Sequence, residues 1–229
     1  MNIKVAVLGA GRVGEFLAWQ FPAGIERVII DPNAKKAQAL AEKFGGSHAS
    51  GSEAASQADV VAAALPAADV PAAFEELAKI VKPGAIVLNM STEAVIGEDF
   101  KKTNPNARFI NAKIVGHARS MQLGMPGYLI TDTDDAAILE KIAVALPGFA
   151  KVMPGDTSMV AVANKIGAGE GIAAAFAVRK KLRESGVPEQ WTDVVISTVC
   201  AGTIRAYVEG DLGEFARKIA EKLERESTP

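Results

Sequence analysis

The sequence feature that most constrains this chain is a glycine pattern close to its start. An apolar run, residues 5–8, leads into Gly9, Gly11 and Gly14, spaced as Gly-x-Gly-x-x-Gly, and a helix-like pattern follows. The next apolar run ends at Asp31. A strand, a glycine turn and a helix, with an acidic residue after the second strand, form the fingerprint of a dinucleotide-binding βαβ unit. The chain should therefore begin with a Rossmann-type unit.

Each residue of the fingerprint has a physical task. Gly9 permits the tight turn off the strand, Gly11 lets a pyrophosphate approach the backbone, and Gly14 lets the helix pack close to the sheet. The helix N-terminus offers free N–H groups and a positive dipole end to the phosphates. Asp31 can accept hydrogen bonds from the ribose hydroxyls of adenosine, which favours NAD, because a 2′-phosphate would meet like charge.

The predicted cofactor contacts come from the glycine turn, from the end of the second strand and from the end of the fourth strand. They are Gly9, Ala10, Gly11, Arg12, Val13, Gly14, Asp31, Leu65 and Pro66. NAD is the expected cofactor. Lys35 and Lys36 lie just beyond Asp31 and could reach a 2′-phosphate, so NADP remains possible.

Composition narrows the class of protein. The 229 residues carry a formal net charge of −2 with both signs spread along the chain, so no nucleic-acid footprint is expected. The single cysteine, Cys200, excludes an intramolecular disulfide framework and favours a reducing cytoplasm. The opening residues run directly into the first strand, and we expect neither a secretory signal nor a membrane span. No His/Cys cluster has metal-ligand spacing, so no metal is expected.

The pattern of apolar runs predicts an α/β fold. Strand-like and helix-like segments alternate up to residue 154, which indicates a doubly wound parallel sheet and an NAD(P)-binding Rossmann domain over 1–154. In this part, helices are expected over 34–44 and 95–102, and strands over 47–49 and 128–131. From residue 155 to 229 the pattern predicts a small all-helical domain, with helices over 157–185, 188–209 and 214–226.

The long helix predicted over 157–185 suggests an assembly. It is rich in alanine and valine on more than one face, and three helices bury little surface alone, so we expect a homodimer through 157–226. Gly167, Gly169 and Gly171 lie inside this helix without a preceding strand. They are not a second phosphate loop, and we expect them to allow close approach of a partner helix or of the cofactor.

With these segments in place, nearly the whole chain resembles the 6-phosphogluconate dehydrogenase-like superfamily. By its small size it looks most like pyrroline-5-carboxylate reductase and the coenzyme F420-dependent NADP oxidoreductases. Residues 111–117 (Asn-Ala-Lys-Ile-Val-Gly-His) and 127–130 (Gly-Tyr-Leu-Ile) are similar to segments of the β-hydroxyacid dehydrogenases. The resemblance implies an NAD(P)-dependent oxidoreductase that transfers hydride to or from a small polar substrate, either an oxo or hydroxy acid or an imine.

The chain departs from these families at the positions that would carry the chemistry. The β-hydroxyacid dehydrogenases place a catalytic lysine on the long helix with an asparagine four residues later. Aligning that helix puts Ala161 at the lysine position and Lys165 at the asparagine position. Asn164 and Lys165 are therefore a displaced candidate pair. The missing lysine also leaves open a non-catalytic dinucleotide-binding sensor or scaffold.

The remaining catalytic candidates follow predicted strands, because ligands of open parallel sheets lie beyond the carboxyl ends of the strands. Ser91 follows the fifth strand and His117 the sixth. A neutral imidazole can exchange the proton that accompanies hydride transfer. The alternative for His117 is a loop histidine bonded to backbone. Lys165 could polarise a carbonyl or imine and Asn164 could orient a substrate, or the lysine could belong to a solvated helix surface.

Overall fold

The structure, a computed structural model, describes residues 3–22 and 24–227. By its contacts the chain divides into two compact units, Met1–Lys165 and Ile166–Pro229. Helix α7 (Thr157–Glu184) runs from the first unit into the second.

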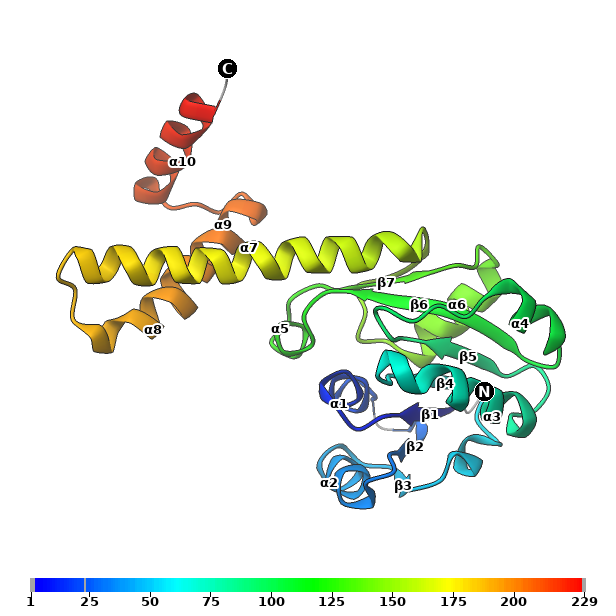
Figure 1. Cartoon of the computed structure of the whole chain (residues 1–229). Helices are drawn as coiled ribbons and strands as arrows, with labels where there is room; N and C mark the ends of the chain where they lie inside the picture. The colour runs from blue at the N-terminus through cyan, green and yellow to red at the C-terminus, as the bar shows by residue number, and fades with distance from the viewer. Residues whose placement is uncertain (1–2, 23, 228–229) are drawn as a thin grey trace. The chain divides into compact units, whose positions relative to one another are not determined.

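The first unit is built on an eight-stranded sheet with the order β3-β2-β1-β4-β5-β6-β7-β8 (Figure 1). Its strands are β1 (Lys4–Leu8), β2 (Glu26–Ile30), β3 (Ser47–Ala49), β4 (Val60–Ala63), β5 (Ile86–Asn89), β6 (Arg108–Val115), β7 (Tyr128–Thr131) and β8 (Lys151–Pro154). Neighbours from β3 to β6 pair in parallel, β7 is antiparallel to β6, and β8 is parallel to β7. The strand order reverses beside β1, which creates the crevice expected for a ligand.

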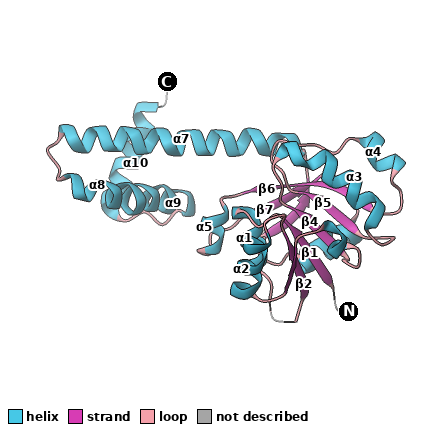
Figure 2. Ribbon diagram, turned by 60° about the horizontal axis from the view of Figure 1, so that its bottom comes forward, coloured by secondary structure: helices cyan, strands magenta, loops and turns pink. Residues whose placement is uncertain are grey.

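Helices cover both faces of this sheet, as Figure 2 shows. They are α1 (Arg12–Trp19), α2 (Ala34–Phe44), α3 (Val70–Ile80), α4 (Glu98–Thr103), α5 (Ala118–Gln122) and α6 (Ala136–Ala145). Alternate residues of β1 point to opposite faces. Val7 is buried with Phe16 of α1, whereas Leu8 is buried with Phe74 of α3. The predicted α/β doubly wound fold with a following helical part is confirmed.

The second unit contains most of α7 and the helices that follow it. After a short 3-10 turn come α8 (Thr192–Val194), a π turn over Val195–Cys200, α9 (Ala201–Glu209) and α10 (Glu214–Ser227). The single helix expected over 188–209 is thus a helical run interrupted by the π turn. There the hydroxyls of Ser197 and Thr198 donate to backbone carbonyls four residues earlier.

One helix of the first unit begins later than expected. The helix predicted over 95–102 begins only at Glu98, as α4. The backbone N–H of Ile96 instead donates to Oδ1 of Asn111 on β6, at 2.8 Å. A side chain from a distant strand therefore holds this backbone in a loop.

Candidate dinucleotide site

The glycine turn has the backbone geometry that its sequence predicts. Gly9 has a φ of +96°, and a Cβ there would lie 2.4 Å from the carbonyl oxygen of Ala64. A Cβ on Gly14 would lie 1.8 Å from the carbonyl oxygen of Gly9. A Cβ on Gly11 would meet no atom within 4 Å. The first and third glycines are therefore required by packing, whereas the space beside the second is open for a ligand to approach the backbone.

Asp31 lies directly beside this turn. Its Oδ2 accepts a hydrogen bond from the N–H of Ala10 at 2.8 Å, and its Oδ1 accepts from the N–H of Asn33 at 2.9 Å. Each carboxylate oxygen keeps a second lone-pair site. The carboxylate is thus held in place and can still accept from ribose hydroxyls.

A cleft of about 750 Å³ opens at this edge of the sheet. Its lining includes seven of the nine residues expected to contact a cofactor: Gly9, Gly11, Arg12, Val13, Asp31, Leu65 and Pro66. The N-terminus of α1 opens into the same region at Gly11, with no side chain bonded over it. Open space beside Gly11, helix N–H groups and a fixed carboxylate suit the phosphates and ribose of a dinucleotide.

The candidate catalytic residues lie outside the lining of this cleft. Ser91 is buried just after β5. His117 is exposed and is the N-cap of α5, where its Nδ1 accepts from the N–H of Ser120 at 3.4 Å. Asn164 of α7 donates from Nδ2 to the carbonyl of Ile114 at 2.8 Å. Lys165 is exposed. The structure thus brings Asn164 to the last part of β6, close in sequence to His117.

Sequence reasoning missed a buried polar network under the loop between β5 and α4. Nδ2 of Asn89 donates to Oδ1 of Asn111 at 2.9 Å, and Nδ2 of Asn111 donates to Oδ2 of Asp132 at 2.7 Å. Lys101 also donates to Oδ2 of Asp132, at 2.7 Å. A run of polar residues inside an otherwise apolar strand, Asn111 and Lys113 in β6, is the signal that could have indicated it.

Lys113 is the most deeply buried charged side chain of this network. Only 1% of it is exposed, and Nζ donates to the backbone carbonyls of Ser91 and Ala94. Burial lowers the pKa of Lys113 to about 8, and the nearby carboxylate of Asp132 opposes that shift. Lys113, a titratable group, therefore anchors the loop that carries Ser91 by hydrogen bonds to its backbone.

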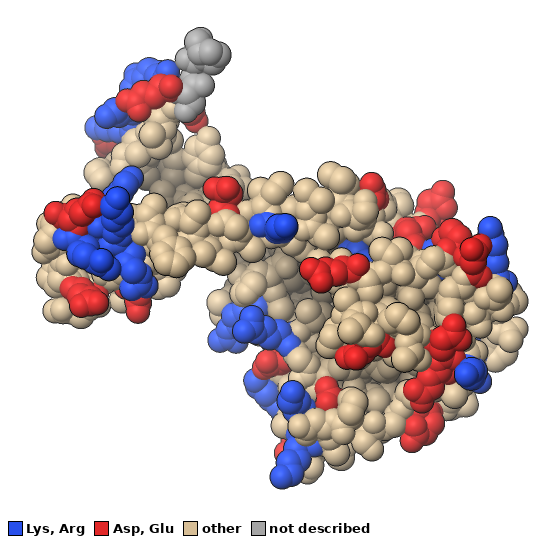
Figure 3. Space-filling view, in the orientation of Figure 1, with Lys and Arg blue, Asp and Glu red and all other residues tan. Residues whose placement is uncertain are grey.

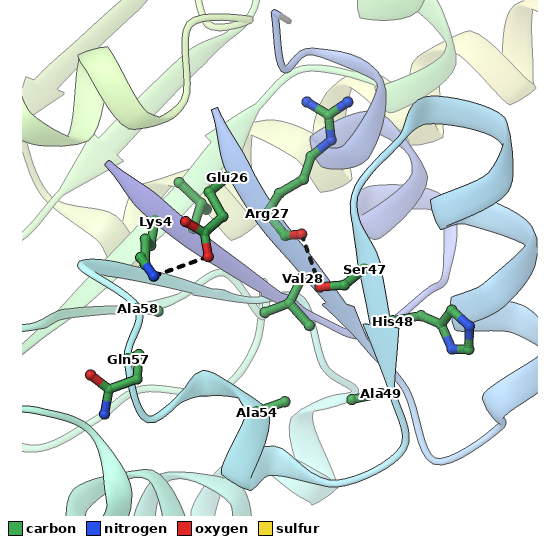
Figure 4. Close-up of a pocket in the computed structure, with 11 residues that line it drawn as sticks. Lys4, Glu26, Arg27, Val28, Ser47, His48, Ala49, Ala54, Gln57 and Ala58 are labelled. Atoms are coloured by element: carbon green, nitrogen blue, oxygen red, sulfur yellow. Dashed lines mark hydrogen bonds and ion pairs between the residues drawn. The ribbon is translucent and has the colours of Figure 1, made fainter. Parts of the chain in front are cut away.

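A smaller hollow, of about 230 Å³, lies on β1, β2 and β3 (Figure 4). An ion pair between Lys4 and Glu26, at 3.0 Å, lies at one side of it. In Figure 4 the ring of His48 points away from this pair. Both members of the pair are the first residues of their strands, at the opposite end from Gly9 and Asp31. The hollow is therefore separate from the dinucleotide cleft.

Over residues 3–22 and 24–227, no helix combines the length and apolar character needed to cross a bilayer. In the same ranges, no three His, Cys, Asp or Glu side chains are grouped as a metal ion would require.

Comparisons with known proteins agree with this geometry. A family model described as "NADP oxidoreductase coenzyme F420-dependent" matches residues 4–93. No curated protein matches the chain by sequence. The pyrroline-5-carboxylate reductase of Coxiella burnetii shares its fold with a TM-score of 0.74 at 14% identity, over 100% of this chain and 86% of that chain.

Two other solved structures share the fold. The 3-hydroxyisobutyrate dehydrogenase of Salmonella typhimurium has a TM-score of 0.66 at 24% identity, over 92% of this chain and 80% of that chain. An imine reductase variant from Myxococcus stipitatus, in complex with NAD⁺, has a TM-score of 0.61 at 19% identity, over 91% of this chain and 76% of that chain. Nothing in these matches supports a non-catalytic sensor or scaffold.

The resemblance expected from the sequence is thereby confirmed. Residues 4–93 are similar to the F420-dependent NADP oxidoreductases, in a chain whose fold is that of pyrroline-5-carboxylate reductases, 3-hydroxyisobutyrate dehydrogenases and imine reductases.

Proposed function

We propose that this protein is an NAD(P)-dependent oxidoreductase that transfers hydride between the nicotinamide cofactor and a small oxo acid, hydroxy acid or imine. The proposal rests on one observation: the glycine turn, Asp31 and the end of β4 line the same cleft. The bound cofactor would supply the hydride chemistry itself. Gly11 and the α1 N-terminus would hold its pyrophosphate, and Asp31 would hold its adenosine ribose, with NAD favoured over NADP.

The proton that accompanies hydride transfer is assigned to His117 in this proposal. Nδ1 also lies 3.1 Å from the hydroxyl oxygen of Ser120, and when Nδ1 carries a proton it can donate to that oxygen, which leaves Nε2 as the ring atom that exchanges a proton. Nε2 has no hydrogen-bond partner among the described residues, so it can take up a proton from the substrate in the neutral ring and return one from the imidazolium. Ser91 and Asn164 would position the substrate, and Lys165 would polarise its carbonyl or imine.

Cofactor binding is the first test. Calorimetric titration of the wild type with NADH and NADPH should show binding of both, with NADH tighter. In Asp31→Ala, NADH affinity should fall about tenfold, because hydrogen bonds to a charged group are worth roughly 1.5–3 kcal/mol. Glu42→Ala is a matched control, since Glu42 is an exposed carboxylate that accepts a hydrogen bond from Gln38. Absence of binding of both cofactors to the wild type would refute the proposal.

Catalysis is tested with a panel of small oxo acids and cyclic imines, by following NADH absorbance. Turnover of one compound, lost in His117→Ala but not in His48→Ala, would support the proton-transfer assignment. Equal activity in both variants would remove His117 from the mechanism while leaving cofactor binding intact.

We also propose a homodimer, with residues 1–154 as the cofactor domain and 155–229 as the dimerisation and substrate-site domain. Large apolar side chains of the second unit are solvent-exposed: Phe176 is 71% exposed, Val208 79% and Phe215 82%. Figure 3 shows few charged side chains over the middle of α7, whereas charges gather at its C-terminal end. Exposed apolar surfaces in a monomer usually mark an interface. We propose a second copy of this chain as the partner that covers this one.

Light scattering checks this assembly. A dimer mass at micromolar concentration is expected for the wild type, and Phe215→Glu should shift the mass toward the monomer. A monomeric wild type would refute the dimer without affecting the cofactor site.

A cytoplasmic location is likewise proposed, and it rests on the single cysteine of the chain.

A further inference from the structure

The ammonium group of Lys113, in β6, holds the loop over residues 90–97, which lies between β5 and α4. Nζ donates to the carbonyl of Ser91 and, at 2.6 Å, to that of Ala94. Burying a charge costs several kcal/mol unless hydrogen bonds compensate for the lost water. Among the described residues, Lys113 finds hydrogen-bond acceptors only in this loop, so the lysine and the loop backbone are coupled.

Two asparagines hold the same loop from the neighbouring strands. Asn89 donates from Nδ2 to the carbonyl of Ala94 at 2.8 Å. Asn111 accepts from the N–H of Ile96 at 2.8 Å and donates to its carbonyl at 3.0 Å. The carbonyl of Ala94 therefore receives two donors. Together these side chains fix the carbonyl oxygens of the loop toward the buried network.

Four backbone N–H groups of the loop are left for a ligand or solvent. The backbone N–H groups of residues 92–95 have no acceptor among the described residues, and Thr92, Glu93 and Val95 are exposed. The loop thus combines inward carbonyls with unpaired N–H donors at the carboxyl end of β5. A loop with its carbonyls fixed and its donors unpaired is preorganised to bind an acceptor.

The strand order places this loop relative to a dinucleotide. Asp31, the predicted ribose contact, follows β2 on one side of β1, whereas β4 and then β5 lie on the other side. The cleft extends from Asp31 across Gly9 to Leu65 and Pro66 at the end of β4. A dinucleotide crosses the crevice at the point where the strand order reverses. Its nicotinamide half therefore lies toward β4 and the loop that follows β5.

We propose that Lys113 is a positioning residue that holds the 90–97 loop in the shape that receives the nicotinamide half of the cofactor. Lys113 itself touches neither cofactor nor substrate. This inference rests on the proposed function. The inference goes beyond the proposed function because it makes a buried lysine of β6 responsible for ordering a loop more than fifteen residues earlier in the chain.

The test compares two ligands that differ only in the nicotinamide ring. Calorimetry measures the Kd of NAD⁺ and of ADP-ribose for the wild type, for Lys113→Met and for the matched control Lys82→Met. Lys82 is a partly buried lysine whose Nζ pairs with Asp59 at 2.8 Å. Lys113→Met should weaken NAD⁺ binding about tenfold and leave ADP-ribose binding within about twofold, while Lys82→Met should change neither.

The outcomes separate the two proposals. If the wild type binds neither ligand, the proposed function fails and this inference fails with it. If the wild type binds both, but Lys113→Met weakens both equally or weakens neither, the proposed function survives and the positioning role is refuted.

A second variant covers the case in which Lys113→Met does not fold. Lys113→Gln keeps an N–H donor without the charge, and it should give an intermediate loss of NAD⁺ affinity. Hydrogen exchange of the loop amides that have acceptors, those of Met90, Ser91 and Ile96, should be faster in both variants than in the wild type, and fastest in Lys113→Met. Unchanged exchange in a folded variant would show that the lysine does not order the loop. A merely structural lysine would lower the melting temperature without this selective loss of NAD⁺ affinity.

Discussion

Adding one methyl group at Gly14 should separate helix α1 from strand β1. The Cβ of Gly14→Ala would lie 1.8 Å from the carbonyl oxygen of Gly9, and neither atom can rotate away, because the backbone fixes both positions. A tolerable contact needs a distance of at least about 3 Å, so the helix and the turn must move apart by more than about 1 Å. That movement disturbs Phe16 and Leu17, which are fully buried under the sheet.

The expected cost follows from this geometry. Overpacking in a well-packed core costs roughly 1–3 kcal/mol, and a backbone-to-backbone clash belongs at the upper end. A loss of about 3 kcal/mol would lower the midpoint of urea unfolding by about 1 M, for an m-value near 3 kcal/mol/M. Circular dichroism during a urea titration measures it directly.

Gly11→Ala is the internal control. A Cβ at Gly11 meets no atom within 4 Å, and its φ of −84° suits any residue. Its stability should stay within about 0.5 kcal/mol of the wild type, while the added methyl group weakens NADH binding at least about tenfold. A Gly14→Ala protein as stable as the wild type would refute the packing explanation of the third glycine.

Two further predictions concern buried polar groups. The pKa of Lys113 is lowered to about 8 in the folded state, so between about pH 8 and pH 10.5 the unfolded chain binds more protons. The free energy of unfolding should therefore rise with pH over that window, by at most about 3 kcal/mol. The pKa of Lys101, in the same network, is raised, because its desolvation by burial is outweighed by its hydrogen bonds with Asp132 and Glu98. Lys113→Met should lack the rise when pH-dependent urea midpoints are compared. Asn164→Ala should cost about 1–2 kcal/mol, because it removes the donor to the carbonyl of Ile114; an unchanged urea midpoint would show that water replaces the bond.

Local patterns predicted the first unit well where glycines and prolines mark the ends of elements. The expected helix over 34–44 and the expected strands over 47–49 and 128–131 agree with α2, β3 and β7 to the residue. In α2, Asn33 caps the start and Gly45, with a φ of +83°, ends the helix. The signals that fix such boundaries lie next to them in the sequence.

The buried network was not predictable in the same way. Lys113 is satisfied by two backbone carbonyls about twenty residues upstream, and a carbonyl carries no residue-type signature. The late start of α4 has the same cause, because the N–H of Ile96 is bonded by a side chain of β6. The catalytic candidates stay predictions for a related reason, since a strand end shows where a residue lies but not what it binds.

The hydrogen bond between Asp31 and the N–H of Ala10 has a consequence for cofactor engineering. The residue expected to discriminate between the two cofactors is also a brace of the glycine turn, at 2.8 Å. Replacing Asp31 with serine or arginine to accept a 2′-phosphate would remove that brace as well as the negative charge. A switch from NAD to NADP in this scaffold should therefore need two substitutions that depend on each other. One replaces Asp31, and the other supports the turn so that the variant binds NADP with useful affinity.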